Sequence, residues 1–199
     1  PLAAYRRTNV EGTRLLARAA AQAGVRRFVF LSSVKVNGER TGATPFTEDD
    51  PPAPEDAYGI SKWEAEQALG EVAAAYGLET VILRSPLVYG PGVRANFLAL
   101  LKLCDSALPL PVGGITGNRR SLIYLGNLID AVHCALTHGA AAGGQYLVRD
   151  RDDVSTAELV RRIRTALGRP DRLLPVPPGI LRAGLALAGR GAVAERLLG

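Results

Sequence analysis

The sequence predicts an α/β fold built on a doubly wound parallel sheet. Helical and strand-like patterns alternate along the first half of the chain. The two clearest strands, residues 27–31 and 80–83, are short and almost wholly apolar, as strands covered on both faces are. A long helical segment, residues 57–76, separates them, as in a right-handed crossover between parallel strands. The length of 199 residues suits one domain with its own core, or one domain and part of another.

Capping and turn-forming residues in the first half of the chain support these elements. Residues 2–23 have a helical pattern that ends at Gly24, and the first strand follows. Residues 37–56 are rich in proline and glycine, so we expect a long loop. Asp56 is placed to cap the helix of residues 57–76, and Gly77 to end it.

The second half is less regular. We expect a helix over residues 95–104, a loop over 108–117, a strand over 121–125 and a helix over 128–136. Ser155 and Glu158 form a capping box for a helix that ends at Gly168. The apolar run 180–188 is too short to span a bilayer and predicts a core or interface helix.

Composition excludes several classes of protein. Hydrophobic residues make up 47% of the chain and charged residues 22%, which is typical of a globular protein. The formal charge of +5 comes from scattered arginines with acidic neighbours, which argues against nucleic-acid binding. The two cysteines, Cys104 and Cys134, are too few for a disulfide framework and too far apart for a zinc motif, so we expect a reducing, cytoplasmic location and no metal. No signal peptide or membrane span is evident.

Tyr58 and Lys62 carry the clearest chemical signal. Their i, i+4 spacing places them on one face of a helix, where the ammonium can lower the pKa of the phenol. Ser33, at the end of the first strand, can add a hydroxyl to the same substrate oxygen. The three groups predict proton transfer to or from an alcohol or ketone.

These residues belong to a set of five motifs. In order, the motifs are residues 9–13 (NVEGT), 28–33 (FVFLSS), 58–62 (YGISK), 88–92 (VYGPG) and 118–124 (NRRSLIY). Together they resemble the extended short-chain dehydrogenases/reductases, in particular the NAD-dependent nucleotide-sugar epimerases and dehydratases. The resemblance implies a Rossmann-like sheet in residues 1–90. Residues 91–199 would be mostly a small α/β substrate domain, with residues 121–148 returning to the sheet.

The resemblance also implies roles for individual residues. Tyr58 would exchange a proton with the sugar hydroxyl, Lys62 would support it and bind the nicotinamide ribose, and Ser33 would share the oxyanion. The implied cofactor is NAD, with NADP not excluded, and its implied contacts are Asn9, Leu31, Ser32, Tyr58, Lys62, Pro86 and Val88. The implied substrate contacts are Ser33, Lys35, Leu87, Asn96 and Arg120, where a guanidinium suits a diphosphate.

Some features depart from the family pattern. No glycine-rich strand-to-helix turn occurs in the chain, although such a turn lets a pyrophosphate approach a helix N-terminus. We therefore expect a fragment of a longer enzyme whose first strands, and the residue that selects NAD over NADP, lie outside it. Val34 and Lys35 stand where dehydratases have an acidic pair, which disfavours water elimination. Leu87, Ser121 and Asn37 also differ from frequent family residues and leave the substrate open.

Three functions compete at this point. A UDP-glucose 4-epimerase-like nucleotide-sugar 4-epimerase is our leading prediction, and an NAD(P)H-dependent reductase of 4-keto-6-deoxy nucleotide sugars is second. A non-catalytic dinucleotide-binding protein is disfavoured because both Tyr58 and Lys62 are present. In relatives, the helices that correspond to residues 2–23 and 57–76 pair across a two-fold axis, so the resemblance also implies a homodimer.

Overall fold

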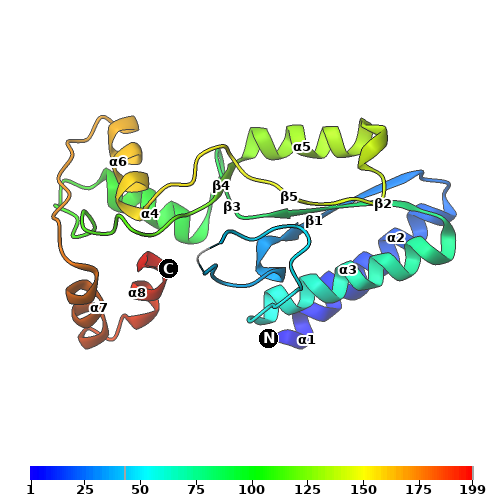
Figure 1. Cartoon of the computed structure of the whole chain (residues 1–199), viewed down its shortest axis with the longest axis horizontal. Helices are drawn as coiled ribbons and strands as arrows, with labels where there is room; N and C mark the ends of the chain where they lie inside the picture. The colour runs from blue at the N-terminus through cyan, green and yellow to red at the C-terminus, as the bar shows by residue number, and fades with distance from the viewer. Residues whose placement is uncertain (43, 199) are drawn as a thin grey trace. The chain divides into compact units, whose positions relative to one another are not determined.

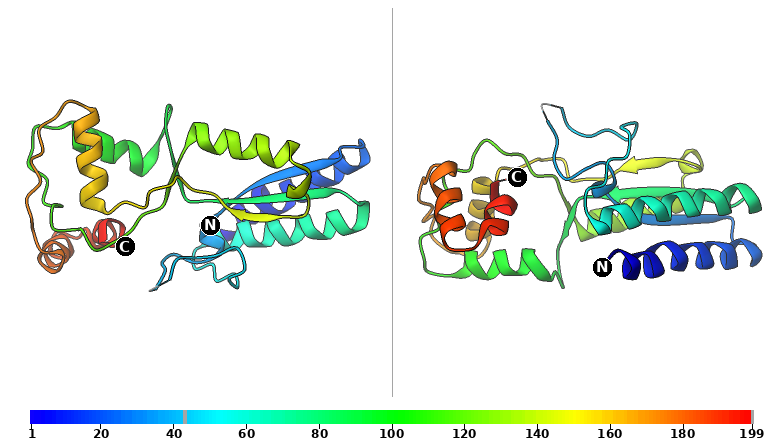
Figure 2. Two further views of the ribbon diagram at one scale, coloured as in Figure 1. Left: turned by 45° about the horizontal axis from the view of Figure 1, so that its top comes forward. Right: turned by 90° about the horizontal axis from the view of Figure 1, so that it is seen from below.

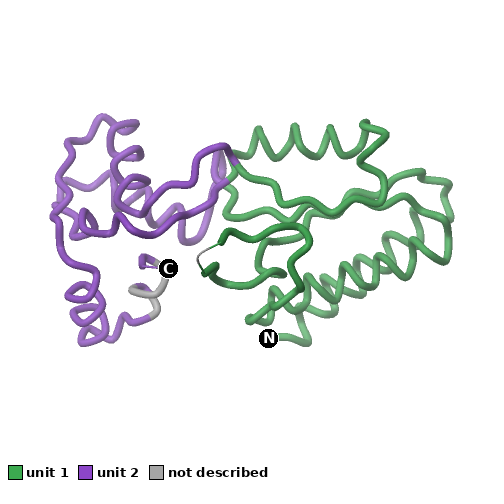
Figure 3. The backbone as a smooth tube through the Cα atoms, in the orientation of Figure 1, with its two compact units in different colours: residues 1–88, 123–149 green, residues 89–122, 150–199 purple. Residues whose placement is uncertain are grey.

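The computed structural model describes residues 1–42 and 44–198. The chain divides into two compact units, coloured separately in Figure 3. Unit 1 consists of residues 1–88 and 123–149, and unit 2 of residues 89–122 and 150–199. The chain therefore leaves unit 1 after residue 88, returns to it at residue 123 and leaves it again after residue 149.

Unit 1 is built on a parallel three-stranded sheet. Its strands are β1 (Arg27–Ser33), β2 (Glu79–Ser85) and β5 (Gln145–Leu147), in the order β1-β2-β5. Helices α2 (Gly12–Gln22) and α3 (Ala57–Tyr76) cover one face, and α5 (Leu125–Thr137) covers the other (Figure 1). The predicted doubly wound α/β fold is confirmed.

Each face of this sheet has its own apolar cluster. Phe30 of β1 packs with Ala65, Leu69 and other residues of the helical face. Val81 and Leu83 of β2 point to the opposite side and pack with Ala135 of α5. The alternation of side chains along a strand divides the residues between the two clusters. Burial on both faces explains why β1 and β2 are nearly continuous apolar runs.

The first helical segment is not one regular helix. It consists of α1 (Leu2–Tyr5), a π-helical stretch η1 (Arg6–Glu11) and α2. Short π-helical segments inside longer helices occur frequently at functional sites. The segment runs beside α3 in both views of Figure 2, and Arg6 and Arg14 form ion pairs with Glu64 and Glu71 of that helix.

The limits of α3 agree with the sequence prediction. The Asp56 side chain accepts a hydrogen bond from the Gly59 amide, and Gly77 adopts the left-handed conformation with φ +66°. These two local signals define the helix ends independently of the tertiary contacts. Between β1 and α3 the chain forms a short 3₁₀ turn, η2 (Val34–Val36), and the predicted long loop.

Unit 2 contains helices α4 (Ala95–Asp105), α6 (Thr156–Ala166), α7 (Pro178–Leu187) and α8 (Gly191–Leu198). Its core includes Phe97 and Cys104 of α4 and Val160 and Ile163 of α6. Ser155 accepts a hydrogen bond from the Glu158 amide, as the capping box predicts. None of the ten residues of α7 is buried, so this segment is not the core helix that its apolar sequence allowed, although half-buried Leu181 packs against the core.

Two short strands of the structure were absent from the sequence prediction. Strands β3 (Leu87–Tyr89) and β4 (Leu122–Tyr124) form a two-stranded sheet, and only β4 was predicted. Strand β5 was also missed, since three residues carry too little periodicity to recognise. It follows a short 3₁₀ turn, η3 (Gly139–Ala141). No helix in residues 1–42 and 44–198 is both long and apolar enough to cross a membrane.

Candidate functional site

The carboxyl end of β1 leads directly into a turn that carries two predicted site residues. Ser33 is buried, and its Oγ accepts a hydrogen bond from the Lys35 amide at 3.3 Å, which caps η2. Ligands of open parallel sheets bind at the carboxyl ends of strands. The turn therefore presents Ser33 at the edge of the sheet where a ligand is expected.

The first turn of α3 packs against this same turn. A Cβ atom at Gly59 would lie 2.8 Å from the Lys35 carbonyl oxygen, so only glycine permits the approach. The Lys35 ammonium forms ion pairs with Asp56 at 2.6 Å and with Glu39 at 2.7 Å. Close backbone contact and the ion pair together hold the start of α3, and with it Tyr58, beside the Ser33 turn.

Tyr58 is half-buried in the first turn of α3. Its ring makes an edge contact with Tyr5, with centroids 5.9 Å apart and an interplanar angle of 68°. Burial raises the pKa of Tyr58, and the nearby Asp56 carboxylate raises it further, while Lys35 opposes both. Because a raised pKa keeps the phenol protonated, Tyr58 is a proton donor at neutral pH in this structure.

Lys62 lies one turn further along α3, also half-buried. Its Nζ donates to the Leu31 carbonyl oxygen at 2.8 Å and lies 4.6 Å from the centroid of the Phe30 ring. Burial lowers the pKa of Lys62, and the Glu66 carboxylate opposes this shift. Lys62 Nζ is 5.9 Å from the Tyr58 ring centroid, and the cation that opposes the rise of the Tyr58 pKa is Lys35. The expectation that Lys62 depresses the phenol pKa is therefore corrected: in this structure burial dominates and raises it.

Two residues expected near the cofactor form hydrogen bonds with other side chains of unit 1. Ser32 is 4% exposed and its hydroxyl donates to Glu66 of α3 at 2.5 Å, so it points into the protein. Its expected place beside the cofactor stays a prediction, and this bond gives its hydroxyl a second role. Asn9, in η1, donates through Nδ2 to Ser61 Oγ at 2.9 Å, and Ser61 Oγ donates to the Tyr58 carbonyl oxygen at 2.8 Å. Asn9 is thus linked to the turn that carries Tyr58.

The remaining predicted contacts are divided between the two units. Pro86, Leu87 and Val88 follow β2 in unit 1, and the Leu87 side chain is 49% exposed. Asn96, in the first turn of α4, and Arg120 belong to unit 2. Arg120 Nε donates to Thr156 Oγ1 at 2.9 Å, and burial lowers the pKa of its guanidinium. Unit 1 by itself therefore brings together Ser33, Lys35, Tyr58 and Lys62 with the strand-end residues.

The sequence analysis missed a buried ion pair behind this site. Arg84 of β2 and Glu66 of α3 form it, and each side chain is only 1% exposed. Two signals in the sequence point to it. Glu66 follows Lys62 by one helical turn, and Arg84 is a charged residue at the end of an otherwise apolar strand. A charge in such a strand requires a partner, because an unpaired buried charge is very costly.

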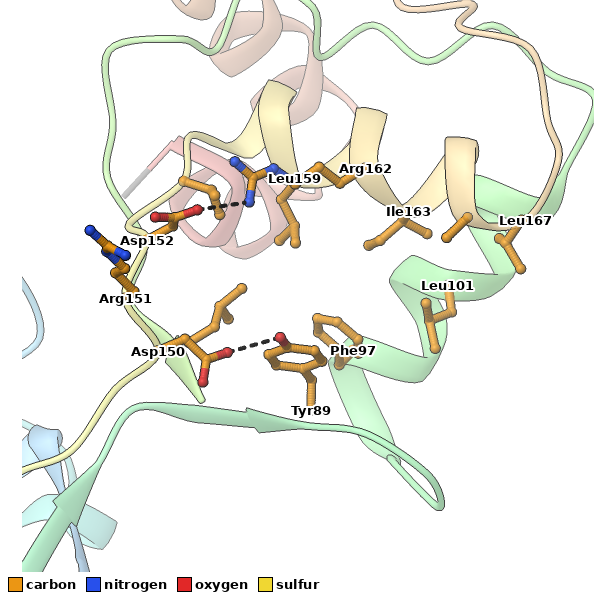
Figure 4. A pocket seen from close by; sticks show the side chains of 13 residues that line it. Tyr89, Phe97, Leu101, Asp150, Arg151, Asp152, Leu159, Arg162, Ile163 and Leu167 are labelled. Atoms are coloured by element: carbon orange, nitrogen blue, oxygen red, sulfur yellow. Dashed lines mark hydrogen bonds and ion pairs between the residues drawn. The ribbon is translucent and has the colours of Figure 1, made fainter. Parts of the chain in front are cut away.

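Unit 2 contains a separate cavity of about 510 Å³ (Figure 4). Its wall is mostly apolar, with Phe97 and Leu101 from α4 and Ile163 from α6. At its edge the Tyr89 hydroxyl donates to Asp150 at 2.8 Å. Among the described residues that line it, none is a predicted site residue. The described residues also include no cluster of His, Cys, Asp or Glu that could hold a metal ion.

The side chains at the strand ends suit one part of a dinucleotide. A phenol and an ammonium at the carboxyl end of a parallel sheet can donate hydrogen bonds to ribose hydroxyls. The described residues of unit 1 contain no glycine-rich turn that could bind a pyrophosphate at a helix N-terminus. The residues present therefore fit the nicotinamide end of NAD.

The Asp56 cap allows a direct test of how α3 is anchored. Asp56→Ala removes both the bond to the Gly59 amide and the ion pair with Lys35, and we expect a loss of about 1 kcal/mol in the free energy of unfolding at pH 7. Asp56→Asn is the matched control, since its amide oxygen can still accept the cap bond. Burial by itself would raise the pKa of Asp56. Hydrogen bonds from the Gly59 amide and from Lys35 together outweigh burial and hold this pKa below its ordinary value. The loss should therefore shrink as pH falls through that lowered pKa, which urea unfolding at several pH values would measure.

Comparisons with known proteins agree with this geometry. The family model described as the NAD dependent epimerase/dehydratase family matches residues 1–148. A UDP-glucose 4-epimerase of Vibrio cholerae is 46% identical over 200 residues, which cover 100% of this chain and 61% of that protein. An N-acetyl-α-D-glucosaminyl-diphospho-ditrans,octacis-undecaprenol 4-epimerase of Escherichia coli O157:H7 is 32% identical over 185 residues, covering 91% of this chain and 55% of the relative.

Solved structures give the same result. The UDP-glucose 4-epimerase of Thermus thermophilus, solved in complex with NAD, matches with a TM-score of 0.67 and 28% identity, covering 85% of this chain and 57% of that one. The chain thus spans between 55% and 61% of the lengths of these three proteins. With three quarters of its length matched by the family model, the chain belongs to the NAD-dependent epimerase/dehydratase family.

Proposed function

We propose that this chain is part of an NAD-dependent nucleotide-sugar 4-epimerase. The observation that carries the proposal is the packing of the first turn of α3, with Tyr58, against the turn that carries Ser33 at the carboxyl end of β1. The identity of 46% to a UDP-glucose 4-epimerase supports the same activity.

Each side chain has a role that follows from its surroundings. Tyr58 would exchange the proton of the sugar 4-hydroxyl, and Ser33 would donate a hydrogen bond to the same oxygen. The Lys62 ammonium has three N–H donors. It would donate one of them to a ribose hydroxyl, and would either keep or give up its present bond to the Leu31 carbonyl. NAD would supply a hydride acceptor that returns the hydride to the other face of the sugar carbon.

The reaction can be tested by following two quantities at once. The full-length protein would be incubated with UDP-glucose or UDP-N-acetylglucosamine, while sugar isomers are resolved by chromatography and NADH by absorbance. Interconversion of the 4-epimers without net NADH supports the proposal. Stoichiometric consumption of NAD(P)H with a UDP-4-keto-6-deoxy sugar, and no interconversion, would replace it with the reductase. Ser121 favours neither reaction, because its hydroxyl already donates to Asp153 at 2.7 Å.

We also propose that the protein is a cytoplasmic homodimer. The segment of α1, η1 and α2 lies beside α3, and Leu15 and Leu16 of α2 are 66% and 62% exposed. Two adjacent exposed leucines are a natural contact for a second copy of the same helices. The cysteines, both free thiols, suit a reducing compartment.

Substitutions on the exposed part of α2 test the proposed homodimer. Leu15→Glu/Leu16→Glu places two charges on the exposed part of α2 and should convert the dimer to a monomer at micromolar concentration. Light scattering measures the mass directly, and Leu136→Glu, an exposed leucine on α5, is the matched control. A wild-type protein that is already monomeric would contradict the proposal.

A further inference from the structure

A buried polar network lies behind the candidate site, where α3 meets the sheet. Arg84 contacts Glu66 through two bonds, Nη2 to Oε2 at 2.6 Å and Nε to Oε1 at 3.0 Å. Both side chains are 1% exposed, so the pair is removed from solvent. Bidentate pairing of this kind fixes the relative orientation of the two groups as well as their distance.

The network joins four segments of unit 1. Ser32 of β1 is the register partner of Arg84 of β2, and its hydroxyl donates to Glu66 of α3. The third guanidinium nitrogen, Nη1, donates to Asn37 Oδ1 at 3.1 Å, and Asn37 Nδ2 donates to the Thr47 carbonyl in the long loop. Two strands, one helix and the loop are therefore held together at a single point.

This point is adjacent to the residues of the site. Glu66 follows Lys62 by one helical turn, on the same side of α3, and Ser32 immediately precedes Ser33. Two successive contacts link α3 to the end of β1: Lys62 Nζ to the Leu31 carbonyl, and Ser32 Oγ to Glu66. Anchoring Ser32 to α3 therefore fixes the backbone position at which Ser33 ends β1.

We propose that Ser32, Glu66 and Arg84 are positioning residues that hold the end of β1 in register with α3, and that the Glu66 carboxylate, one helical turn beyond Lys62 on the same side of α3, is a counter-charge for the Lys62 ammonium. The proposal rests on the proposed function for its catalytic consequence, although its electrostatic part does not depend on it.

Two physical arguments support a role beyond stability. Buried ion pairs can often be replaced by apolar residues of similar volume without loss of stability, so folding alone does not require one here. Glu66 also opposes the lowering of the Lys62 pKa by burial. The charged groups that act on the neighbouring Tyr58 are different ones, namely Asp56 and Lys35, together with the phenol of Tyr5. Of the two residues, Glu66 therefore influences Lys62 and not Tyr58.

The electrostatic part can be measured without any assay of activity. Residues 1–199 contain three lysines, Lys35, Lys62 and Lys102, so the 13Cε signals of labelled lysine can be assigned by loss of one signal in Lys62→Arg. In Glu66→Gln the titration midpoint of Lys62 should move to lower pH. Glu158→Gln, in an exposed ion pair on α6, is the matched control. An unchanged Lys62 midpoint in folded Glu66→Gln overturns this part.

The positioning part is tested by Ser32→Ala. This change removes one hydroxyl and leaves both bonds between Arg84 and Glu66, so the variant should fold even if Glu66→Gln does not. We expect kcat for the epimerisation to fall on the order of 10-fold with KM for the sugar unchanged, because a small misplacement affects the reacting geometry more than binding. NAD affinity, measured by calorimetry, should also be unchanged.

The possible outcomes separate the two proposals. An unchanged kcat in Ser32→Ala overturns the positioning role. If NAD binding is weakened while kcat is normal, Ser32 acts as a cofactor contact instead. If the wild-type protein catalyses a reduction instead of epimerisation, the same kcat comparison applies to that reaction. The proposed function would then fail, while the shift in the Lys62 titration would still stand.

Discussion

Tyr58→Phe should lower the rate of sugar interconversion by a factor of about 10² to 10⁴ while the protein stays folded. The substitution removes only the phenolic oxygen, and the remaining ring can keep its edge contact with Tyr5. The sugar hydroxyl then has no phenolic oxygen with which to exchange its proton. Steady-state kinetics with both epimers, together with circular dichroism, would measure the effect.

Tyr146→Phe is the matched control for this experiment. Its hydroxyl makes one long bond, 3.4 Å to the Ala140 carbonyl, at the surface of the same unit. We expect wild-type turnover in the control. If Tyr58→Phe retained full turnover, the acid-base assignment would be wrong, whichever reaction the enzyme catalyses.

The pH dependence should follow the two shifted groups. The Tyr58 pKa is raised, so the free enzyme holds this proton over the neutral range, and a step that needs the phenolate should gain rate as pH rises. The Lys62 pKa is lowered, so the favourable ammonium is lost earlier in the alkaline range than for an exposed lysine. We therefore expect a bell-shaped profile of kcat/KM whose alkaline limb belongs to Lys62, which Lys62→Arg should move to higher pH.

Arg84→Met should destabilise the protein by about 3–5 kcal/mol, the largest stability effect that we expect from a single substitution in unit 1. The change leaves the Glu66 carboxylate buried with the Ser32 hydroxyl as its remaining partner in the network. It also removes the donor to Asn37 Oδ1, which anchors the long loop. Chemical unfolding with fitted m-values gives the free energy directly.

A second substitution tests whether the cost comes from the unpaired charge. In Glu66→Gln/Arg84→Met no buried charge remains, and the Gln amide oxygen can still accept the Ser32 bond. The double variant should recover most of the lost stability. If it is as unstable as Arg84→Met, the cost comes from packing of the arginine side chain, which also stacks near Trp63 with its guanidinium carbon 6.0 Å from the ring centroid.

Local signals were sufficient for most of unit 1. Asp56 and Gly77 mark the ends of α3 through interactions with their own neighbours, and the apolar run of β1 is recognisable without knowledge of its partners. Strands β3 and β5 have three residues each, too few for a pattern, and exist because longer elements hold them in place. The π-helical stretch η1 is likewise invisible in a sequence whose periodicity is simply helical.

The chain order of Ser33, Tyr58 and Lys62, together with the three other motifs, was enough to identify the family and to predict a proton-transfer site. The charge state of that site was not accessible in the same way, because a pKa depends on burial and on groups brought together from distant parts of the chain. Lys35 comes next to Tyr58 only because Gly59 lets α3 approach the turn after β1. Ser32, predicted as a cofactor contact, forms part of a buried network because Glu66 and Arg84, 18 residues apart in sequence, meet in space beside it. Spacing along the chain predicts the reacting groups, and three-dimensional packing decides which side chains are buried and which other residues they contact.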